Sequence, residues 1–229
     1  MTFQGFDKQL VTFLKGLAKN NDKKWFDANK PSFREHVQDP MLACIEAMAK
    51  KLEAISPHLT AVAKRQGGSL QRIYRDTRFS KDKSPYNTYV AARFAHDQCE
   101  GGTAPGYYLR IDTKNVTLGC GIWQPDTPLV TAIRQAIVDD PKAWQKAKGN
   151  KKFVAEFGEL QGESLKRPPR GFDPEHPYVD DLRRKDFVGF CELPHKELFD
   201  KSFVTKVGSA YRTGKPLMQF LCEALELPF

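Results

Sequence analysis

Residues 106–123 read GYYLRIDTKNVTLGCGIW. The runs 106–112 and 115–123 alternate with a period of two and are rich in aromatic and β-branched side chains, which is typical of strands. Only Thr113-Lys114 joins them, and so short a connection favours antiparallel neighbours over a parallel crossover. The middle of the chain is therefore predicted to form an antiparallel sheet.

The same strand pattern occurs on both sides of this hairpin. Residues 70–79 and 86–96 precede it, separated from each other by 81–85, and residues 98–105 lead into the hairpin. A fifth run, 187–193, comes much later in the chain. Together these runs predict a mainly antiparallel sheet of about five strands.

Segments with helical periodicity surround the predicted sheet. One apolar stripe near the N-terminus consists of Leu10, Phe13, Leu14 and Leu17. A longer helix follows, which Pro40 should kink near its middle. After the sheet, Thr127 is a candidate cap for another helix. The Pro- and Gly-rich residues 161–177 are expected to form a long surface loop.

The expected fold is α+β, with helices packed on the sheet in a single domain spanning residues 1–229. Within it we distinguish a helical N-terminal part at 1–60 and a sheet core at 68–125. Residues 126–229 supply further helices and one more strand. The sequence contains no internal repeat and no long Gly/Ser linker that would divide it.

Composition limits the class of protein. No apolar run approaches the roughly 18 residues of a membrane span, and the N-terminus lacks the order of a secretory signal. The cysteines are odd in number, far apart and never in a C-x-x-C pair, a pattern that suits a reducing compartment. They are Cys44, Cys99, Cys120, Cys191 and Cys222. We therefore expect a cytoplasmic protein.

The net charge is +8, with 36 basic and 28 acidic side chains, and it is unevenly distributed. Residues 61–95 carry eight basic groups against two acidic ones. Residues 142–170 carry eight against three, although the lysines of 142–152 fit the exposed face of a helix. A concentrated basic field favours phosphates, nucleic acids or acidic partners.

The densest chemistry lies between Arg72 and Tyr86, in the run RIYRDTRFSKDKSPY. If 70–79 is extended, Arg72, Asp76 and Arg78 share one face of the strand. The same alternation pairs Tyr89 with Arg93 and Tyr108 with Arg110, and it aligns Gly119, Gly121 and Trp123. Glycines there would let a ligand, a helix or an aromatic ring approach the backbone. Should these faces coincide, the sheet would carry a patch of guanidinium groups, tyrosines and an indole.

Such a patch predicts recognition of an anion, because arginine offers planar, bidentate donors to phosphate or carboxylate. Asp76 is the candidate catalytic residue, as a base or as a group that orients an arginine. The expected ligand-binding residues are Arg72, Arg75, Asp76, Arg78, Asp82, Lys83, Tyr86, Tyr108 and Arg110. The alternative is a structural ion-pair network that fixes a hairpin, since such networks often imitate sites.

No motif indicates a cofactor or a metal. The histidines show neither an H-E-x-x-H pattern nor close Cys/His spacing, so no metal site is expected. Gly119-Cys120-Gly121 lies on a predicted strand rather than in a G-x-G-x-x-G turn, which argues against a dinucleotide site. There is no P-loop and no G-x-S-x-G elbow.

The charged run also carries a resemblance. The chain resembles the bacterial family catalogued as domain of unknown function 2461, marked by R-x-x-R-D-x-R-F-x-x-x-[D/N]-K-x-x-Y. The matching positions are Arg72, Arg75, Asp76, Arg78, Phe79, Asp82, Lys83 and Tyr86. The resemblance extends over nearly the whole chain and implies no activity.

The function expected from the sequence is therefore binding of a phosphorylated or carboxylated small molecule, by a binding protein or an enzyme. The alternative is a non-catalytic nucleic-acid or protein-interaction module that uses a basic, aromatic sheet face. No membrane association is expected, and the sequence does not give the oligomeric state.

Overall fold

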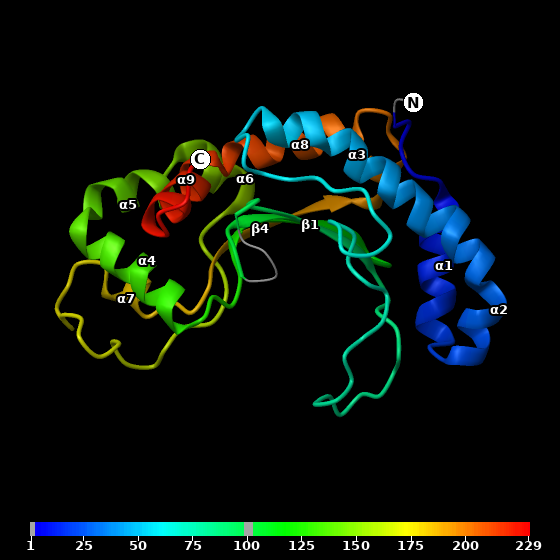
Figure 1. Cartoon of the computed structure of the whole chain (residues 1–229), viewed down its shortest axis with the longest axis horizontal. Coiled ribbons are helices and arrows are strands. Elements are labelled where there is room, and N and C mark those ends of the chain that lie inside the picture. The colour runs from blue at the N-terminus through cyan, green and yellow to red at the C-terminus, as the bar shows by residue number, and fades with distance from the viewer. Residues whose placement is uncertain (1–2, 99–102) are drawn as a thin grey trace.

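A computed structural model describes residues 3–98 and 103–229 of the chain. Within these ranges the strands form one antiparallel sheet of four, in the order β1-β2-β3-β4 (Figure 1). They are β1 (Val90–Ala95), β2 (Gly106–Ile111), β3 (Asn115–Ile122) and β4 (Phe187–Pro194). The α+β class and the antiparallel pairing are confirmed. The connection expected at 98–105 lies partly outside the described residues, and Cys99 lies outside them.

The sequence predicted a fifth strand at 70–79, and this prediction is wrong. This segment contains no strand, and its β pairing is limited to two isolated bridges, Leu70 with Ala92 and Tyr74 with Tyr86. Beyond Tyr74 the chain forms a loop in which Arg78 bonds to Asp76 and Arg75 bonds to Asp82, so the segment lacks a partner strand of matching length. The number of strands predicted from the sequence was therefore one too high.

The N-terminal part consists of helices, as expected. They are α1 (Lys8–Lys19), α2 (Lys23–Phe33), a π-helical turn η1 (Arg34–Gln38) and α3 (Asp39–Glu53). The side chains of Asp7 and Asp22 cap α1 and α2. The irregularity expected at Pro40 is the π-helical turn just before it. The backbone stays helical from α2 through η1 into α3, so Pro40 lies inside a continuous helix and its missing N–H removes one helical hydrogen bond.

The helices after the sheet are short. They are α4 (Thr127–Asp139), α5 (Pro141–Lys148), α6 (Lys151–Phe157), α7 (Val179–Leu182), the 3-10 helix η2 (His195–Phe199), α8 (Phe203–Thr213) and α9 (Lys215–Ala224). Asp126, rather than Thr127, caps α4 by accepting the N–H of Leu129. In the described ranges no helix has the length and apolar character needed to cross a membrane.

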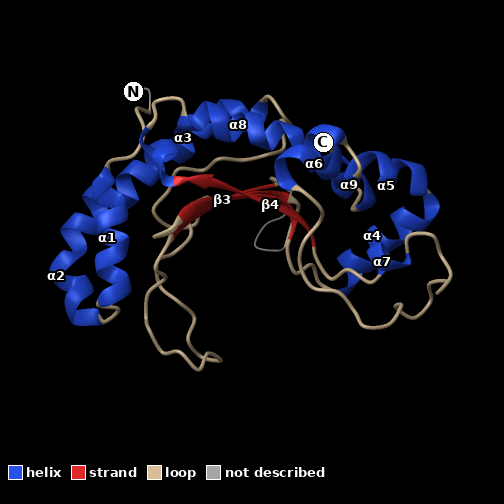
Figure 2. Ribbon diagram, turned by 180° about the vertical axis from the view of Figure 1, so that it is seen from behind, coloured by secondary structure: helices blue, strands red, loops and turns tan. Residues whose placement is uncertain are grey.

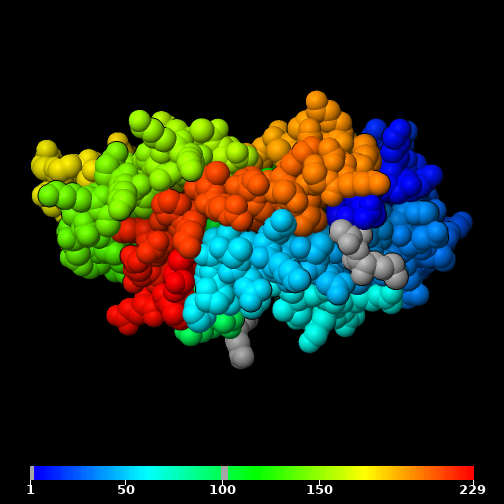
Figure 3. All heavy atoms as spheres, turned by 90° about the horizontal axis from the view of Figure 1, so that it is seen from above, coloured from blue at the N-terminus to red at the C-terminus, as the bar shows by residue number. Residues whose placement is uncertain are grey.

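Helices cover one face of the sheet. In Figure 1, α3 and α8 run above the strands, and Figure 3 looks down on this helical layer. The strand residues that face it are almost completely buried, among them Phe94, Leu109 and Leu118. The ring of Tyr211, from α8, stacks on Tyr107 at 4.4 Å, and its hydroxyl donates to the carbonyl of Tyr108. The main core therefore lies between the sheet and these helices.

The opposite face of the sheet carries no helix in the part of the chain that the structure describes. The molecule has the shape of an arch, with α1 and α2 at one end and α4, α5 and α7 at the other (Figures 1 and 2). The segments 70–89 and 161–177 extend on the same side as this uncovered face. The uncovered face therefore lies on the concave side of the arch.

Irregular segments pair with both edges of the sheet. Along β1, the backbone N–H groups of Gln71 and Thr60 donate to Ala91 and Ala95. Along β4, the N–H of Gln161 donates to Val188 and its side chain donates to the carbonyl of Phe190. Neither edge strand is therefore open along its whole length.

Candidate functional site

The uncovered face of the sheet is the floor of a cavity of about 600 Å³, here called the sheet cavity. The strand register aligns Arg93, Tyr108, Gly119 and Phe190 in one row across the sheet. Arg110 pairs with Thr117 in the next row, and Glu192 lies beyond it. All of these residues line the cavity, so the register brings together the arginines and the tyrosine that the sequence suggested.

Neighbouring side chains fix the Arg110 guanidinium but leave some of its N–H groups without a hydrogen-bond acceptor in the part of the chain that the structure describes. Its Nη2 donates to Asp112 at 3.0 Å, and its guanidinium carbon lies 4.3 Å from the centre of the Tyr89 ring. Its Nε is buried and has no hydrogen-bond partner among the described residues. Arg93 donates to the carbonyl of Ala104 and forms no ion pair with any described carboxylate. Both guanidinium groups therefore retain capacity to bind an anion.

Aromatic side chains form the other lining of the sheet cavity. The Trp123 side chain is 49% exposed and contacts the Phe190 ring edge to face at 5.9 Å. The Phe190 ring lies on Gly119, where a Cβ atom would come within 2.6 Å of it. The missing side chain at Gly119 thus admits an aromatic ring of the protein. Burial raises the pKa of Tyr108 to about 12, so its hydroxyl keeps its proton at neutral pH and can donate.

A second cavity of about 270 Å³ lies between α2, η1 and the segment 65–73, and we call it the helix cavity. Its cationic lining consists of Lys30, Arg34, Arg65 and Arg72. Its aromatic lining consists of Phe26, Phe33, Tyr74 and Tyr89. None of its lining residues is acidic, and only Arg65 pairs with a carboxylate, that of Asp39. This cavity is therefore strongly basic.

Most of the predicted cluster lies in an exposed loop, residues 74–86, which the Tyr74–Tyr86 bridge closes. Within it, Arg78 donates hydrogen bonds from Nε and Nη2 to the Asp76 carboxylate, and Arg75 forms an ion pair with Asp82. Lys83 donates to the carbonyl of Thr77, and Phe79 is 95% exposed. None of Arg75, Asp76, Arg78, Asp82 and Lys83 lines either cavity. Of the nine predicted ligand-binding residues, only Arg72, Tyr108 and Arg110 do.

Tyr86 forms the base of the 74–86 loop. Its ring stacks on Phe26 of α2 at 4.2 Å. The Asn21 side chain bonds to both the N–H and the carbonyl of Tyr86, at 3.1 and 2.9 Å. These contacts fix the loop on the N-terminal helices.

Acid is expected to loosen the tip of this loop before it affects the core. A hydrogen bond from Arg78 lowers the pKa of Asp76, and bonds from Ser84 and then Arg75 lower that of Asp82. Because both values fall below the unfolded value of about 3.9, the stabilisation is present above about pH 4 and is lost as the pH falls further. Hydrogen exchange should show falling protection factors at the Arg78 and Ser84 amides, which donate to these carboxylates. Unchanged protection down to pH 2 would contradict this assignment.

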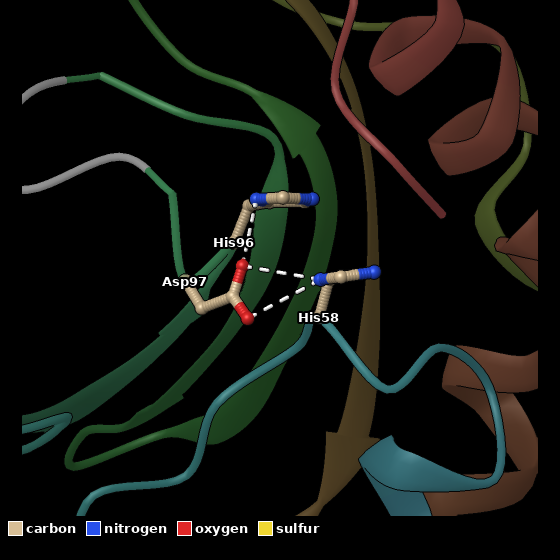
Figure 4. A group of neighbouring side chains, drawn as sticks. All are labelled: His58, His96 and Asp97. Atoms are coloured by element: carbon tan, nitrogen blue, oxygen red, sulfur yellow. Dashed lines mark hydrogen bonds and ion pairs between the residues drawn. The ribbon is translucent and has the colours of Figure 1, made fainter.

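His58, His96 and Asp97 form a further cluster of possible metal ligands, all within 4.8 Å of one another (Figure 4). The Asp97 carboxylate lies 3.2 Å from His58 Nδ1 and 3.3 Å from His96 Nδ1. The two rings are nearly parallel, at 10°, so their lone pairs do not converge on one point. His96 Nδ1 also accepts the N–H of Gln98, and Nε2 donates to the carbonyl of Pro228. These contacts connect the end of β1 to His58 and to Pro228 near the C-terminus, both distant in sequence.

Sequence reasoning assigned no site role to Lys30, Arg34 or Phe190. Lys30 and Arg34 look like ordinary exposed cations of a helix, and only the position of 65–73 beside them makes a cavity. Alternation along the strand placed Trp123 on one face with Gly119 and Gly121, and all three line the sheet cavity. His58 and His96 are too far apart in sequence to suggest a cluster, although His96-Asp97 is one half of it.

These observations define an α+β protein whose uncovered sheet face and adjoining basic cavity are rich in arginine and aromatic side chains. The chain belongs to the family described as conserved hypothetical protein (DUF2461), whose model matches residues 9–220. Comparison with curated proteins and comparison with solved structures each gave no match.

Proposed function

We propose that this protein binds a small anionic ligand, phosphorylated or carboxylated, in the sheet cavity. The observation that carries the proposal is the incomplete pairing of Arg93 and Arg110, which share that cavity with one carboxylate, Glu192. Partly buried charge that is incompletely paired is costly, and an anion offsets that cost. Arginine is also the side chain that best matches phosphate and carboxylate geometry.

The rest of the lining fits a ligand that has a planar part. A volume of about 600 Å³ falls in the usual range for small-molecule sites. The half-exposed indole of Trp123 offers a face for stacking, and the protonated Tyr108 hydroxyl offers a further donor. A single nucleotide, with an aromatic base and a phosphate, combines both features. The proposal assigns no reaction, since the candidate catalytic Asp76 lines neither cavity.

A thermal-shift screen tests the proposal with nucleotides, sugar phosphates and dicarboxylates. A ligand at a hundredfold excess over its Kd should stabilise the wild type by about 2.7 kcal/mol. Arg110→Ala should lose this stabilisation, because it removes the guanidinium at the cavity wall. Arg78→Ala is the matched control, since it removes an arginine from the loop tip, outside both cavities.

Two results would count against this proposal. One is a screen without any stabilising anion. The other is a ligand that stabilises wild type and Arg110→Ala equally but fails with Arg78→Ala, which would move the site to the 74–86 loop. Arg110→Lys keeps the positive charge and loses the planar fork, so it should retain only part of the stabilisation.

A further inference from the structure

The sheet cavity and the helix cavity adjoin each other. Gln71 lines both of them. Tyr89 belongs to the wall of the helix cavity, and its ring carries the guanidinium of Arg110, which lines the sheet cavity. The two cavities therefore meet at Gln71 and this tyrosine–arginine pair, and a ligand longer than one cavity would extend across them.

The helix cavity holds positive charge that the protein itself does not neutralise. The side chains of Lys30, Arg34 and Arg72 form no hydrogen bond or ion pair with any described residue. Arg65 is paired, but with an exposed carboxylate, and exposed pairs contribute little. Three unpaired cations in one recess suit the phosphates of a polyanion.

Aromatic side chains as well as cations line both cavities. Tyr74 is 56% exposed and Tyr89 is partly buried in the helix cavity, and Trp123, Tyr108 and Phe190 follow in the sheet cavity. Cations that follow the backbone, together with rings on which bases stack, are the means by which proteins bind single-stranded nucleic acid. A duplex hides the faces of its bases and could not use these rings.

We infer that the two cavities together bind a single-stranded nucleic acid. One nucleotide occupies the sheet cavity, and the phosphates of its neighbours lie against Lys30, Arg34 and Arg72. This inference rests on the proposed function, because it takes the anionic ligand of the sheet cavity to be one unit of a strand. The segment 161–177 extends on the same side of the arch (Figure 1), but its Lys166, Arg167 and Arg170 are balanced by three acidic side chains, so it adds no net charge.

The test compares a single nucleotide with a fluorescent single strand of about eight nucleotides, a length that such stacking surfaces cover. Calorimetry measures the nucleotide and anisotropy measures the strand over a range of salt concentrations. The strand should bind more tightly, with log Kd depending on log salt at about 0.7 per neutralised phosphate. The double variant Arg34→Ala/Arg72→Ala should weaken strand binding about tenfold and reduce the salt slope by about 1.4.

The double variant Lys142→Ala/Lys146→Ala is the matched control, because it also removes two positive charges, from exposed positions of α5 that line neither cavity. It should leave both the strand affinity and the salt slope unchanged. Equal losses in the two double variants would mean that net charge alone attracts the strand, and would overturn the inference. Circular dichroism confirms that each variant is folded before binding is measured.

The outcomes separate this inference from the proposal beneath it. If the nucleotide binds and the strand binds no more tightly, the inference fails and the proposed function stands. If neither binds, the inference fails, and the proposed function fails with it only when the thermal-shift screen also finds no other stabilising anion. Duplex of the same length that binds as well as the single strand, or inorganic polyphosphate that competes equally with it, would show that the rings play no part and would also overturn the inference.

Discussion

Replacement of Gly121 by alanine is expected to cost about 4 kcal/mol of folding free energy or more, enough to leave little native protein. Gly121 lies in β3 with a φ of +125°, a backbone conformation that side chains with a Cβ rarely adopt. A Cβ atom there would lie 2.0 Å from the carbonyl oxygen of Phe187. Since this oxygen belongs to the neighbouring strand, relief of the clash requires β4 to move away from β3.

The consequence would extend to the site, because β4 carries Phe190 and Glu192. Urea denaturation followed by circular dichroism measures the loss. Gly67→Ala is the matched control, since Gly67 also has a positive φ, +66°, but would place its Cβ in open space. It should cost only about 1 kcal/mol. Equal losses in the two variants would show that the close approach of β4 at Gly121 is not what limits this position.

The second large effect is expected for Tyr86→Ala, which should lower the free energy of unfolding by about 3 kcal/mol. Tyr86 is 3% exposed, and its ring is packed between Phe26, at 4.2 Å, and Tyr74, at 5.4 Å. Removal of the ring leaves a void beside α2 that the surrounding helices cannot close. The 74–86 loop also loses its anchor, so trypsin should cut at its arginines and lysines faster than in the wild type.

Tyr86→Phe separates the ring from its hydroxyl. The hydroxyl forms no hydrogen bond with any described residue, so this variant should stay within about 0.5 kcal/mol of the wild type. A loss in Tyr86→Phe as large as in Tyr86→Ala would show that the hydroxyl has a role that the packing does not explain. A loop that resists trypsin in Tyr86→Ala would show that Asn21 alone holds its base.

The sequence predicted those parts of the fold whose pattern is locally decisive. The alternation of 106–123 and its two-residue joint led directly to β2 and β3, with the expected antiparallel pairing. The run 187–193 became β4 because its apolar residues fill the core beside β3. Residues 70–79 show the limit of the method. A period of two describes an extended chain, but a strand also needs a partner, and the partner of Tyr74 is Tyr86 alone.

The candidate site also has one part that the sequence could predict and another that depends on tertiary packing. The face shared by Tyr108, Arg110 and Trp123 follows from alternation along strands, so the sequence could suggest it. The helix cavity depends on how 65–73 packs against α2, a long-range contact that no local pattern encodes. The density of charge around Asp76 suggested a binding pocket, yet the structure places these side chains in internal ion pairs at an exposed tip. Local charge thus pointed to the loop, and tertiary packing created the cavities elsewhere.

The irregular segments along β1 and β4 bear on how this protein behaves at high concentration. A sheet with one bare face and free edges would be a template for edge-to-edge pairing, the usual first step toward aggregation. Here the residues around Thr60 and Gln71, and Gln161 on the far side, already occupy hydrogen-bonding groups at the two edges. The concave face can therefore remain open to a ligand while the sheet resists growth by addition of strands from other molecules.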